Sequence, residues 1–570
     1  MVLLQNNAAQ RDWLVLLILL VGVLFAGVGL RDPWPADEPR FAQVAREMVE
    51  TGQWLFPMRA GELYPDKPPV FMWMIACFFV LTGSLKLAFL LPSALSGVIS
   101  AIAVFDLSCR LYDRTAAWFA TLTLLFSFQF MLQAKTAQID ATVCMWITLG
   151  CYGVLRATLC AGQHRWWYAA CVFMALGIMT KGVGFLPLLL LIPYAVLLAG
   201  QQSSNQLHRL SAGQWLTGIG LLFATLSVWL LPMILTVQAS GDSAMMAYRD
   251  NILLKQTVTR YANAWHHIKP FWYYLTNVVP WAWLPVVLLL PWLTKHWWRA
   301  IKDRRASVVI PLAFTVLTVL FFSISSGKRG VYILPALPML VVAAAPYLSV
   351  VYARTGVRRL LLGFTLSIAL VMIALGMLAL AGKGPLPALY ARHDVDISWW
   401  LVVTGVLMVL AVLSVRKWAI AIWCAFSLVL WLSYSFWGAP SVNTARTPHN
   451  IFKVAQRYVP IDSEVALIDA KEQFILFSPF KVVHFGYHTP VERQLEAAWQ
   501  WQSELNTNIS RWIMMPDSVD STCFDTANAV EAGIAHRERW ILLPESARLP
   551  TCEMTLPLPV VFSYQGKAYE

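Results

Sequence analysis

WLVLLILLVGVLFAGVGL, residues 13–30, contains no charged side chain. A helix needs about 20 consecutive apolar residues to cross a bilayer, so this run predicts a membrane-spanning segment. Further apolar runs follow, with boundaries good to a few residues, at about 70–83, 87–109, 115–133, 138–160, 166–180, 183–199, 215–238, 271–293, 307–323, 331–352, 359–381, 399–415 and 419–437. They are continuous rather than alternating, which favours helices over a transmembrane β-barrel. We therefore expect a polytopic α-helical membrane protein.

The composition supports this fold class. Of the 570 residues, 58% are hydrophobic and only 13% are charged, whereas about one quarter of a soluble protein is charged. An ordinary cytosolic enzyme, a disordered chain and a small disulfide-rich domain are thereby excluded. Run 13–30 lacks a small-residue cleavage site and many apolar runs follow it, so we do not expect a cleaved signal peptide.

The net charge is +12, from 43 basic and 31 acidic residues, and the position of the basic residues indicates the orientation of the chain in the membrane. Lys and Arg collect in the cytoplasmic loops of membrane proteins, so the excess does not indicate a nucleic-acid partner. With the basic segment 295–305 placed inside, the N-terminus is cytoplasmic. Three regions then lie outside: residues 31–86, 239–270 and the tail after 437.

The number of crossings depends on run 70–83, which is the shortest and begins at Lys67-Pro68-Pro69. As a re-entrant or interfacial helix it leaves 13 crossings. If it crosses, the count is 14 and loop 31–69 lies inside. We favour 13, and expect a transmembrane domain at 1–437 and a soluble α/β domain at 438–570.

Hydropathy falls after Gly438, and short strands alternate with polar helices. We expect strands at 464–469, 481–485, 511–515 and 540–543 and an amphipathic helix at 490–504. Cys523 and Cys552 lie in this tail, where a disulfide and two free thiols are both open. The other cysteines lie in or beside apolar runs as packing residues, and none has the spacing of a structural zinc site.

Ionisable residues gather on the predicted outer face, where charge is expensive near the membrane. They are Asp37, Glu38, Arg40, Asp66, Lys67, Asp140, Lys181, Arg260, His266, His267, Lys328 and Arg329, with Tyr64 and Tyr332 beside them. Lys and Arg on this face oppose the usual charge distribution and predict an anionic partner, such as a lipid phosphate. A carboxylate among cations stays ionised, so Asp37 and Asp140 are candidates for a general base or for holding a cationic or hydroxylated ring.

Other roles remain open for these residues. Asp37 could cap a helix at 38–50 and Asp140 its own helix, since Asp is a good N-cap. Lys67 could be a solvated loop residue and Arg260 an interface residue. His266 and His267 could be surface residues or, with Asp66, ligands of a divalent metal, although this spacing matches no recognised zinc motif.

Three stretches carry a family resemblance: DEPRFAQVAREM at 37–48, followed by GQW at 52–54, YPDKPP at 64–69, and 260–274 with its His-His-Ile-Lys-Pro. They resemble the external loops of GT-C glycosyltransferases, in the branch of bacterial lipid A aminoarabinose transferases and protein O-mannosyltransferases. Thr180-Lys181-Gly182 and Gly327-Lys328-Arg329 are also similar. The resemblance implies 13 crossings and an extracytoplasmic α/β tail.

The resemblance implies a donor, undecaprenyl phosphate carrying 4-amino-4-deoxy-L-arabinose, and a lipid A phosphate as acceptor, as in the lipopolysaccharide modification linked to polymyxin resistance. Asp37 matches the catalytic acid, with Asp140 as a second candidate. Lys67 and Arg260 match donor-phosphate contacts, to which we add Lys181. The substrate-lining positions are Glu38, Arg40, Tyr64, Lys328, Arg329 and Tyr332. We expect a monomer among membrane lipids and no required cofactor, with the divalent metal left open; Asp66 stands where relatives can have Glu.

Charge grows on the polyprenyl phosphate as it leaves, so Lys67 and Arg260 should stabilise the transition state more than the ground state. An incoming phosphate oxygen is already anionic, and Asp37 would then orient the sugar; for a hydroxyl acceptor it would be a base. The alternatives are a GT-C transferase acting on a protein or glycan, and a lipid-linked sugar transporter. A transporter needs a charged path to both faces and often inverted repeats, and neither is evident.

Overall fold

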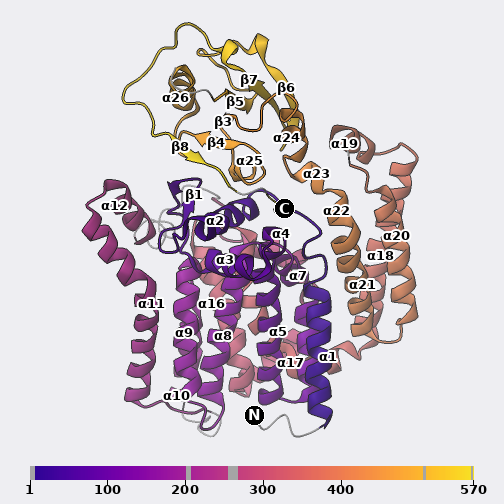
Figure 1. Cartoon of the computed structure of the whole chain (residues 1–570). Coiled ribbons are helices and arrows are strands. Elements are labelled where there is room, and N and C mark those ends of the chain that lie inside the picture. Colours follow the sequence, from indigo (N-terminus) through magenta and orange to yellow (C-terminus); the bar gives the residue numbers. More distant parts are fainter. Residues whose placement is uncertain are drawn as a thin grey trace.

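The computed structural model describes residues 7–200, 207–253, 268–393, 395–504, 509–566 and 569. A bundle of long helices fills one half of the molecule, and a mixed sheet lies beyond one end of the bundle (Figure 1). Between them lie α2 (Glu38–Thr51), the hairpin of β1 (Met58–Arg59) and β2 (Glu62–Leu63), and α3 (Val70–Thr82). The first loop of the chain is therefore enclosed between bundle and sheet.

The N-terminal part of the bundle combines long apolar helices with several short ones. Its elements are α1 (Asn7–Leu24), α4 (Leu85–Ala88), α5 (Leu91–Leu111), α6 (Arg114–Leu125), α7 (Phe128–Ala134), α8 (Ile139–Leu159), α9 (Arg165–Lys181), the 3₁₀ turn η2 (Leu186–Leu190), α10 (Leu191–Ala199), α11 (Ala212–Ser240) and α12 (Ser243–Asp250). Helix α11 stands at the edge of the bundle (Figure 1) and exposes Leu216, Phe223 and Val228. Such an apolar outer face is that of a helix in contact with lipid.

The C-terminal half of the bundle continues with helices that several short turns interrupt. They are η4 (Tyr274–Val278), α14 (Val279–Ala282), α15 (Val286–Lys302), α16 (Ala306–Ile324), η5 (Gly330–Ile333), α17 (Ala336–Tyr352), α18 (Thr355–Leu380), α19 (Leu386–His393), α20 (Ser398–Ser414), α21 (Ala419–Ser433), η6 (Tyr434–Gly438), α22 (Ala439–Ser441), α23 (Asn443–Arg446) and α24 (His449–Ala455). Helix α17 is the central one, with nearly all of its side chains buried.

Seven of the described helices are long and apolar enough to cross a membrane, or up to nine if each bent pair counts as one span. The chain is thus a multi-pass membrane protein, as predicted, but the count of 13 crossings stays a prediction. Two predicted runs are broken: 115–133 bends by 66° between α6 and α7, and 271–293 bends by 105° before α15. The first helix also begins and ends about six residues earlier than run 13–30 suggested.

Helix α3 has 13 residues, which extend over about 20 Å at 1.5 Å per residue, less than the roughly 30 Å of a bilayer core. The arrangement with 14 crossings would place loop 31–69 and the tail on opposite sides of the membrane. In the structure the loop touches the tail, since Arg59 Nη1 lies 2.8 Å from Glu472 Oε1. The geometry therefore contradicts the 14-crossing alternative.

The tail forms a six-stranded sheet in the order β6-β7-β5-β3-β4-β8. Its strands are β3 (Glu464–Leu467), β4 (Lys481–His484), β5 (Arg511–Pro516), β6 (Val530–Ala535), β7 (Glu538–Leu543) and β8 (Phe562–Tyr564), with α25 (Glu472–Leu476) and α26 (Val491–Ser503). Strand β3 is parallel to both β4 and β5, and the outer pairs are antiparallel. The four predicted strands are present, while β6 and β8 were missed because glycine and polar residues weaken their apolar alternation.

Cys523 and Cys552 form a disulfide, which decides between the two alternatives left open by the sequence. The other cysteines of the chain are free. Most of them are buried or half-buried in helices, as expected of packing residues, but Cys77 is exposed on the outer face of α3.

Candidate functional site

Asp37 lies immediately before α2 and is surrounded by basic side chains. Its Oδ2 accepts a hydrogen bond from Arg329 Nη2 at 3.0 Å, and its Oδ1 lies 4.0 Å from Arg40 Nη1. The side chain makes no capping hydrogen bond to α2, so the alternative role as an N-cap is contradicted. Residues 35–37 form a turn that leads into α2, and Pro39 lies in the first helical turn.

Burial by itself would raise the pKa of Asp37. The positive charges of Arg329, Arg40 and Lys181 outweigh burial and lower the pKa below its ordinary value of 3.8. Asp37 is therefore a carboxylate at neutral pH, which agrees with the expectation for an acid among cations.

A second carboxylate, Asp140, lies in the first turn of α8 and accepts a hydrogen bond from Lys181 at the end of α9. The Lys181 ammonium group also lies 4.4 Å from the centre of the Tyr332 ring, a cation–π contact. Both members of the ion pair are largely buried. The positive charge of Lys181 helps to lower the pKa of Asp37, and the negative charge of Asp140 helps to raise the pKa of Arg329. The two carboxylates therefore belong to one electrostatic cluster.

Glu472, in the first turn of α25, joins this cluster from the sheet. Its Oε1 accepts from Arg40 Nε at 2.7 Å and from Arg59 Nη1 at 2.8 Å. Burial alone would raise the pKa of Glu472, but the two guanidinium groups outweigh it and lower the pKa. Sequence reasoning missed this residue, because its partners lie more than 400 positions away and no local motif marks it.

We call this set the charge cluster: Asp37, Arg40, Arg59, Asp140, Lys181, Arg329 and Glu472. Four cations face three carboxylates, which leaves an excess of positive charge. Tyr64, fully buried, lies beside it: the centre of its ring is 5.4 Å from the Arg59 guanidinium, and burial raises the pKa of its hydroxyl. Such a set can hold a phosphate while its carboxylates orient a hydroxyl or ammonium group.

The donor-phosphate contacts predicted from the sequence are only partly described. Lys67 Nζ donates to the carbonyl of Asp66 at 2.9 Å, at the start of the Pro68-Pro69 turn that precedes α3. Arg260 lies outside the described residues, as do His266 and His267. The end of their loop is anchored next to Arg329, since Ile268 pairs with Gly327 and Lys269 N donates to Ser326 O at 3.2 Å.

The metal prediction is untested, because two of its three residues are not described. Within the described ranges, no group of three His, Cys, Asp or Glu side chains is arranged to hold a metal ion. Asp66 alone offers one carboxylate, which is too few ligands for a bound divalent ion.

Two residues predicted to line the substrate site have their polar atoms bound within the protein. Lys328 donates to the carbonyl oxygens of Ser325 and, at 3.0 Å, of Lys269, so it holds two backbone segments together. Glu38 accepts from both Nη atoms of Arg31, at 2.6 and 2.7 Å, and is buried. We therefore assign both to the support of the site, since their polar atoms already have protein partners.

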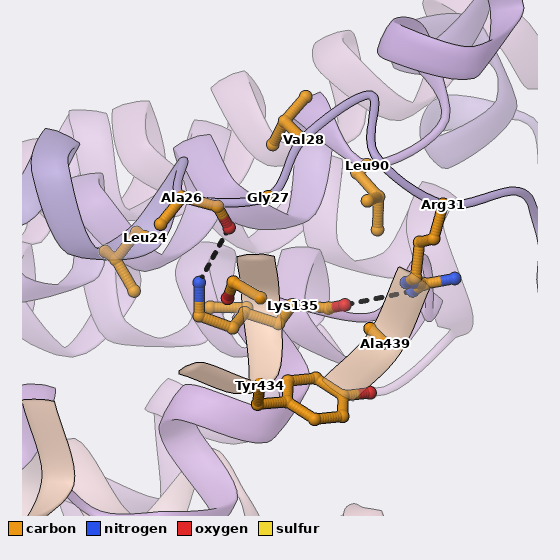
Figure 2. A pocket seen from close by; sticks show the side chains of 11 residues that line it. Leu24, Ala26, Gly27, Val28, Arg31, Leu90, Lys135, Tyr434 and Ala439 are labelled. Atoms are coloured by element: carbon orange, nitrogen blue, oxygen red, sulfur yellow. Dashed lines mark hydrogen bonds between the residues drawn. The ribbon is translucent and has the colours of Figure 1, made fainter. Parts of the chain in front are cut away.

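The Glu38 network fastens the first loop to the bundle. Glu38 also accepts from the backbone N–H of Trp34 and of Ala137. Arg31 donates in turn to the carbonyl of Lys135, and Lys135 Nζ donates to Ala26 O at 3.0 Å (Figure 2). Ala26, Arg31 and Lys135 are among the residues that line a cavity of about 20 Å³, which has room for about one water molecule. The neighbouring Asp37 is consequently presented from a fixed backbone.

Three comparisons with known proteins bear on this arrangement. The family model described as dolichyl-phosphate-mannose-protein mannosyltransferase matches residues 66–231. The solved structure of ArnT from Cupriavidus metallidurans bound to undecaprenyl phosphate superposes with a TM-score of 0.71 at 19% identity, over 95% of this chain and 99% of that one. The chain has the GT-C fold of ArnT. The same protein in its apo state gives a TM-score of 0.69.

Sequence relatives agree with this membrane GT-C fold. The chain is 33% identical over 336 residues to an undecaprenyl phosphate-alpha-4-amino-4-deoxy-L-arabinose arabinosyl transferase of Pseudomonas fluorescens, over 57% of this chain and 58% of the relative. It is 26% identical over 481 residues to the transferase of that name from Serratia proteamaculans, over 80% of this chain and 83% of the relative. The chain thus resembles the aminoarabinose transferases, and it spans a little over half of the first relative.

Proposed function

We propose that this protein is an inverting glycosyltransferase that moves 4-amino-4-deoxy-L-arabinose from undecaprenyl phosphate to a phosphate of lipid A. The observation that carries the proposal is the charge cluster around Asp37, in a chain that resembles the aminoarabinose transferases. We place the reaction at the periplasmic face of the bacterial inner membrane, with residues 31–86, 239–270 and 438–570 all on that side. The contact between Arg59 and Glu472 supports a common side for the first loop and the tail.

The positive excess of the cluster supports a phosphate-bearing donor. A site that contains both carboxylates and basic side chains attracts an anion only if the basic side chains outnumber the carboxylates. Around Asp37 they do, since Arg40, Arg329 and Lys181 surround one carboxylate. In our proposal Lys67 and Arg260 bind the donor phosphate and stabilise the charge that grows on it as the glycosidic bond breaks. The acceptor oxygen attacks the anomeric carbon from the opposite face, which inverts its configuration.

Asp37 is proposed to orient the sugar and not to remove a proton. A phosphate acceptor is already anionic and needs no base, while the lowered pKa of Asp37 makes it a weak base at neutral pH. A carboxylate that stays ionised is well suited to bind the ammonium group of aminoarabinose. Asp140, neutralised by Lys181, would keep that lysine in place beside Tyr332.

The test uses purified protein in detergent, with undecaprenyl phosphate-aminoarabinose and lipid A. Mass spectrometry should show lipid A gaining one aminoarabinose and the donor being consumed, without a sealed compartment. Asp37→Asn should abolish the gain while membrane expression is unchanged. Lys67→Ala and Arg260→Ala should weaken donor use, and unchanged dependence on donor concentration would count against phosphate binding by these two residues.

A second candidate is a GT-C transferase that glycosylates a protein or glycan. It is favoured by the match of residues 66–231 to the protein mannosyltransferase model. Mass spectrometry of lipid A from cells with and without the gene distinguishes the two, because only the first candidate shifts the lipid A mass. A cysteine-accessibility scan at positions 55–62 tests the proposed side of the first loop.

A further inference from the structure

A second cavity, lined by both polar and apolar side chains, lies on the side of the molecule where α19 approaches the sheet. Its volume is about 460 Å³, and it is lined from three directions: by Tyr390 and Ile397 of the connection between α18 and α20, by Arg446 of α23, and by His536 and Arg537 of the β6–β7 hairpin. We call it the interface pocket. Its volume lies within the range of pockets that hold small molecules, and none of the residues that line it belongs to the charge cluster.

The charged side chains that line the interface pocket are basic. Arg446 and Arg537 are both exposed, and no Asp or Glu side chain is among the lining residues. Among the described residues neither guanidinium forms an ion pair; Arg446 packs instead over the ring of Trp34, with its Cζ 5.1 Å from the ring centre. Two arginines without a carboxylate favour an anion, and the planar guanidinium group matches phosphate oxygens with paired hydrogen bonds.

Two further polar atoms at the pocket lack partners. Tyr390 Oη and His536 Nε2 are shielded from solvent and have no hydrogen-bond partner in the described part of the chain. Because both atoms are closed to water, they lie behind the accessible surface of the pocket, and the two arginines are the polar groups that a ligand meets first. His536 and Arg537 form the two-residue turn between β6 and β7 with φ of 55° and 76°. This tight hairpin turn holds both side chains before any ligand arrives.

The position of the pocket indicates where the anion comes from. Helices α18 and α20 expose apolar side chains along their length, among them Val371, Met377 and Trp399, as lipid-facing helices do. Figure 1 shows α19 at the end of this helix pair that is nearer to the sheet. The pocket thus begins where the lipid-facing surface ends, at the depth of the lipid headgroups.

We propose that the interface pocket binds the phosphate-bearing headgroup of a membrane lipid through Arg446 and Arg537. Since Arg446 packs on Trp34, which precedes Asp37 by three residues, the bound lipid also supports the loop that carries Asp37. The proposal is independent of the sugar and acceptor proposed above.

The experiment titrates the full-length protein in detergent with phosphatidylglycerol, and separately with zwitterionic phosphatidylcholine, and counts retained lipids by native mass spectrometry. The protein should retain phosphatidylglycerol in preference. Replacing one charged hydrogen-bonding group typically weakens binding on the order of 10-fold, so Arg537→Gln should lose about 10-fold and Arg446→Gln/Arg537→Gln more. Arg457→Gln, an exposed arginine outside the pocket, is the matched control and should bind as the parent protein does.

A second measurement, of Tm, separates loss of binding from misfolding. Phosphatidylglycerol should raise the Tm of the parent protein and of Arg457→Gln but not that of Arg537→Gln. Without lipid, Arg537→Gln should have the same Tm as the parent protein. Inorganic phosphate is the competing ligand. If millimolar phosphate raises the Tm as strongly as the lipid does, the pocket takes a free anion and the membrane source is refuted. Equal lipid retention by the double variant and the control would overturn the proposal altogether.

Discussion

Replacing Glu472 by glutamine removes the one carboxylate that joins Arg40 and Arg59, and so tests whether the sheet is part of the site. The side chain is 3% exposed, and those of Arg59 and Arg40 are 4% and 27% exposed. Solvent therefore screens these ion pairs little. Breaking one partner of a buried ion pair costs about 3–5 kcal/mol. Because a glutamine oxygen still accepts one hydrogen bond, we expect the lower end, about 3 kcal/mol.

An increase of about 3 kcal/mol in the free energy of the docked state corresponds to roughly a 100-fold rise in local opening. Amide hydrogen exchange of residues 58–64 should accelerate by about that factor, and kcat should fall because Arg40 loses its anchor. Glu464→Gln is the matched control, since Glu464 pairs with Lys481 and Arg511 within the sheet. Unchanged exchange at 58–64 in Glu472→Gln, with unchanged kcat, would refute the reasoning.

The same pair predicts a pH dependence. The pKa of Glu472 is lower in the folded protein than its ordinary value of 4.5. A carboxyl group whose pKa is lower in the folded than in the unfolded protein stabilises the folded state at pH values above its unfolded pKa. This contribution is lost as the pH falls from about 4.5 towards the pKa of the group in the folded protein. The protection factors of residues 58–64, from which the intrinsic pH dependence of amide exchange is divided out, should therefore fall on acidification in the parent protein. In Glu472→Gln this part of the pH dependence should be missing.

Asp37→Asn should reduce transfer at least 1000-fold and lower Tm slightly, because the negative charge that pairs with Arg329 is lost; transfer within 10-fold of the parent rate would contradict the proposed role. Lys181→Met should raise KM for the donor more than it lowers kcat, by on the order of 10-fold, as measured by donor titration; an unchanged KM would remove Lys181 from the phosphate site. Glu38→Gln should lower Tm, since a buried pair with Arg31 is broken, while residual activity at low temperature remains. Cys552→Ser opens a loop of 29 residues and should cost the sheet about 3.5 kcal/mol, visible as faster proteolysis of the tail; equal proteolysis under oxidising conditions would show that the disulfide contributes no stability.

The fold class was predictable because it rests on local properties of the chain. Continuous apolar runs require lipid or a buried core wherever they lie, and alternating apolar residues favour strands. The bends at 66° and 105° were not predictable, since an apolar run of sufficient length carries no signal of where tertiary packing will break it. The placement of Asp37 with Arg40, Lys181 and Arg329 followed from the cost of charge near a membrane and from the family resemblance.

Other parts of the site depended on contacts between distant segments. Glu38 and Asp37 are adjacent and both acidic, yet successive residues of a helix point about 100° apart. Glu38 therefore faces Arg31 and the bundle core, and Asp37 faces Arg329 and the other cations of the cluster. Lys328 and Arg329 divide in the same manner between backbone support and the cluster.

A multi-pass helical protein with a strand-rich tail could be predicted from the amino-acid sequence, as could most of the cationic residues, because hydrophobicity and charge are properties of single residues and short windows. Two features emerged only from the folded protein: Glu472 closes the cluster, 432 positions along the chain from Arg40, and the tail lies on the same side as the first loop. An ion pair forms only where two charged side chains come close in space. That distance is set by the folded backbone and cannot be read from the order of residues along the chain.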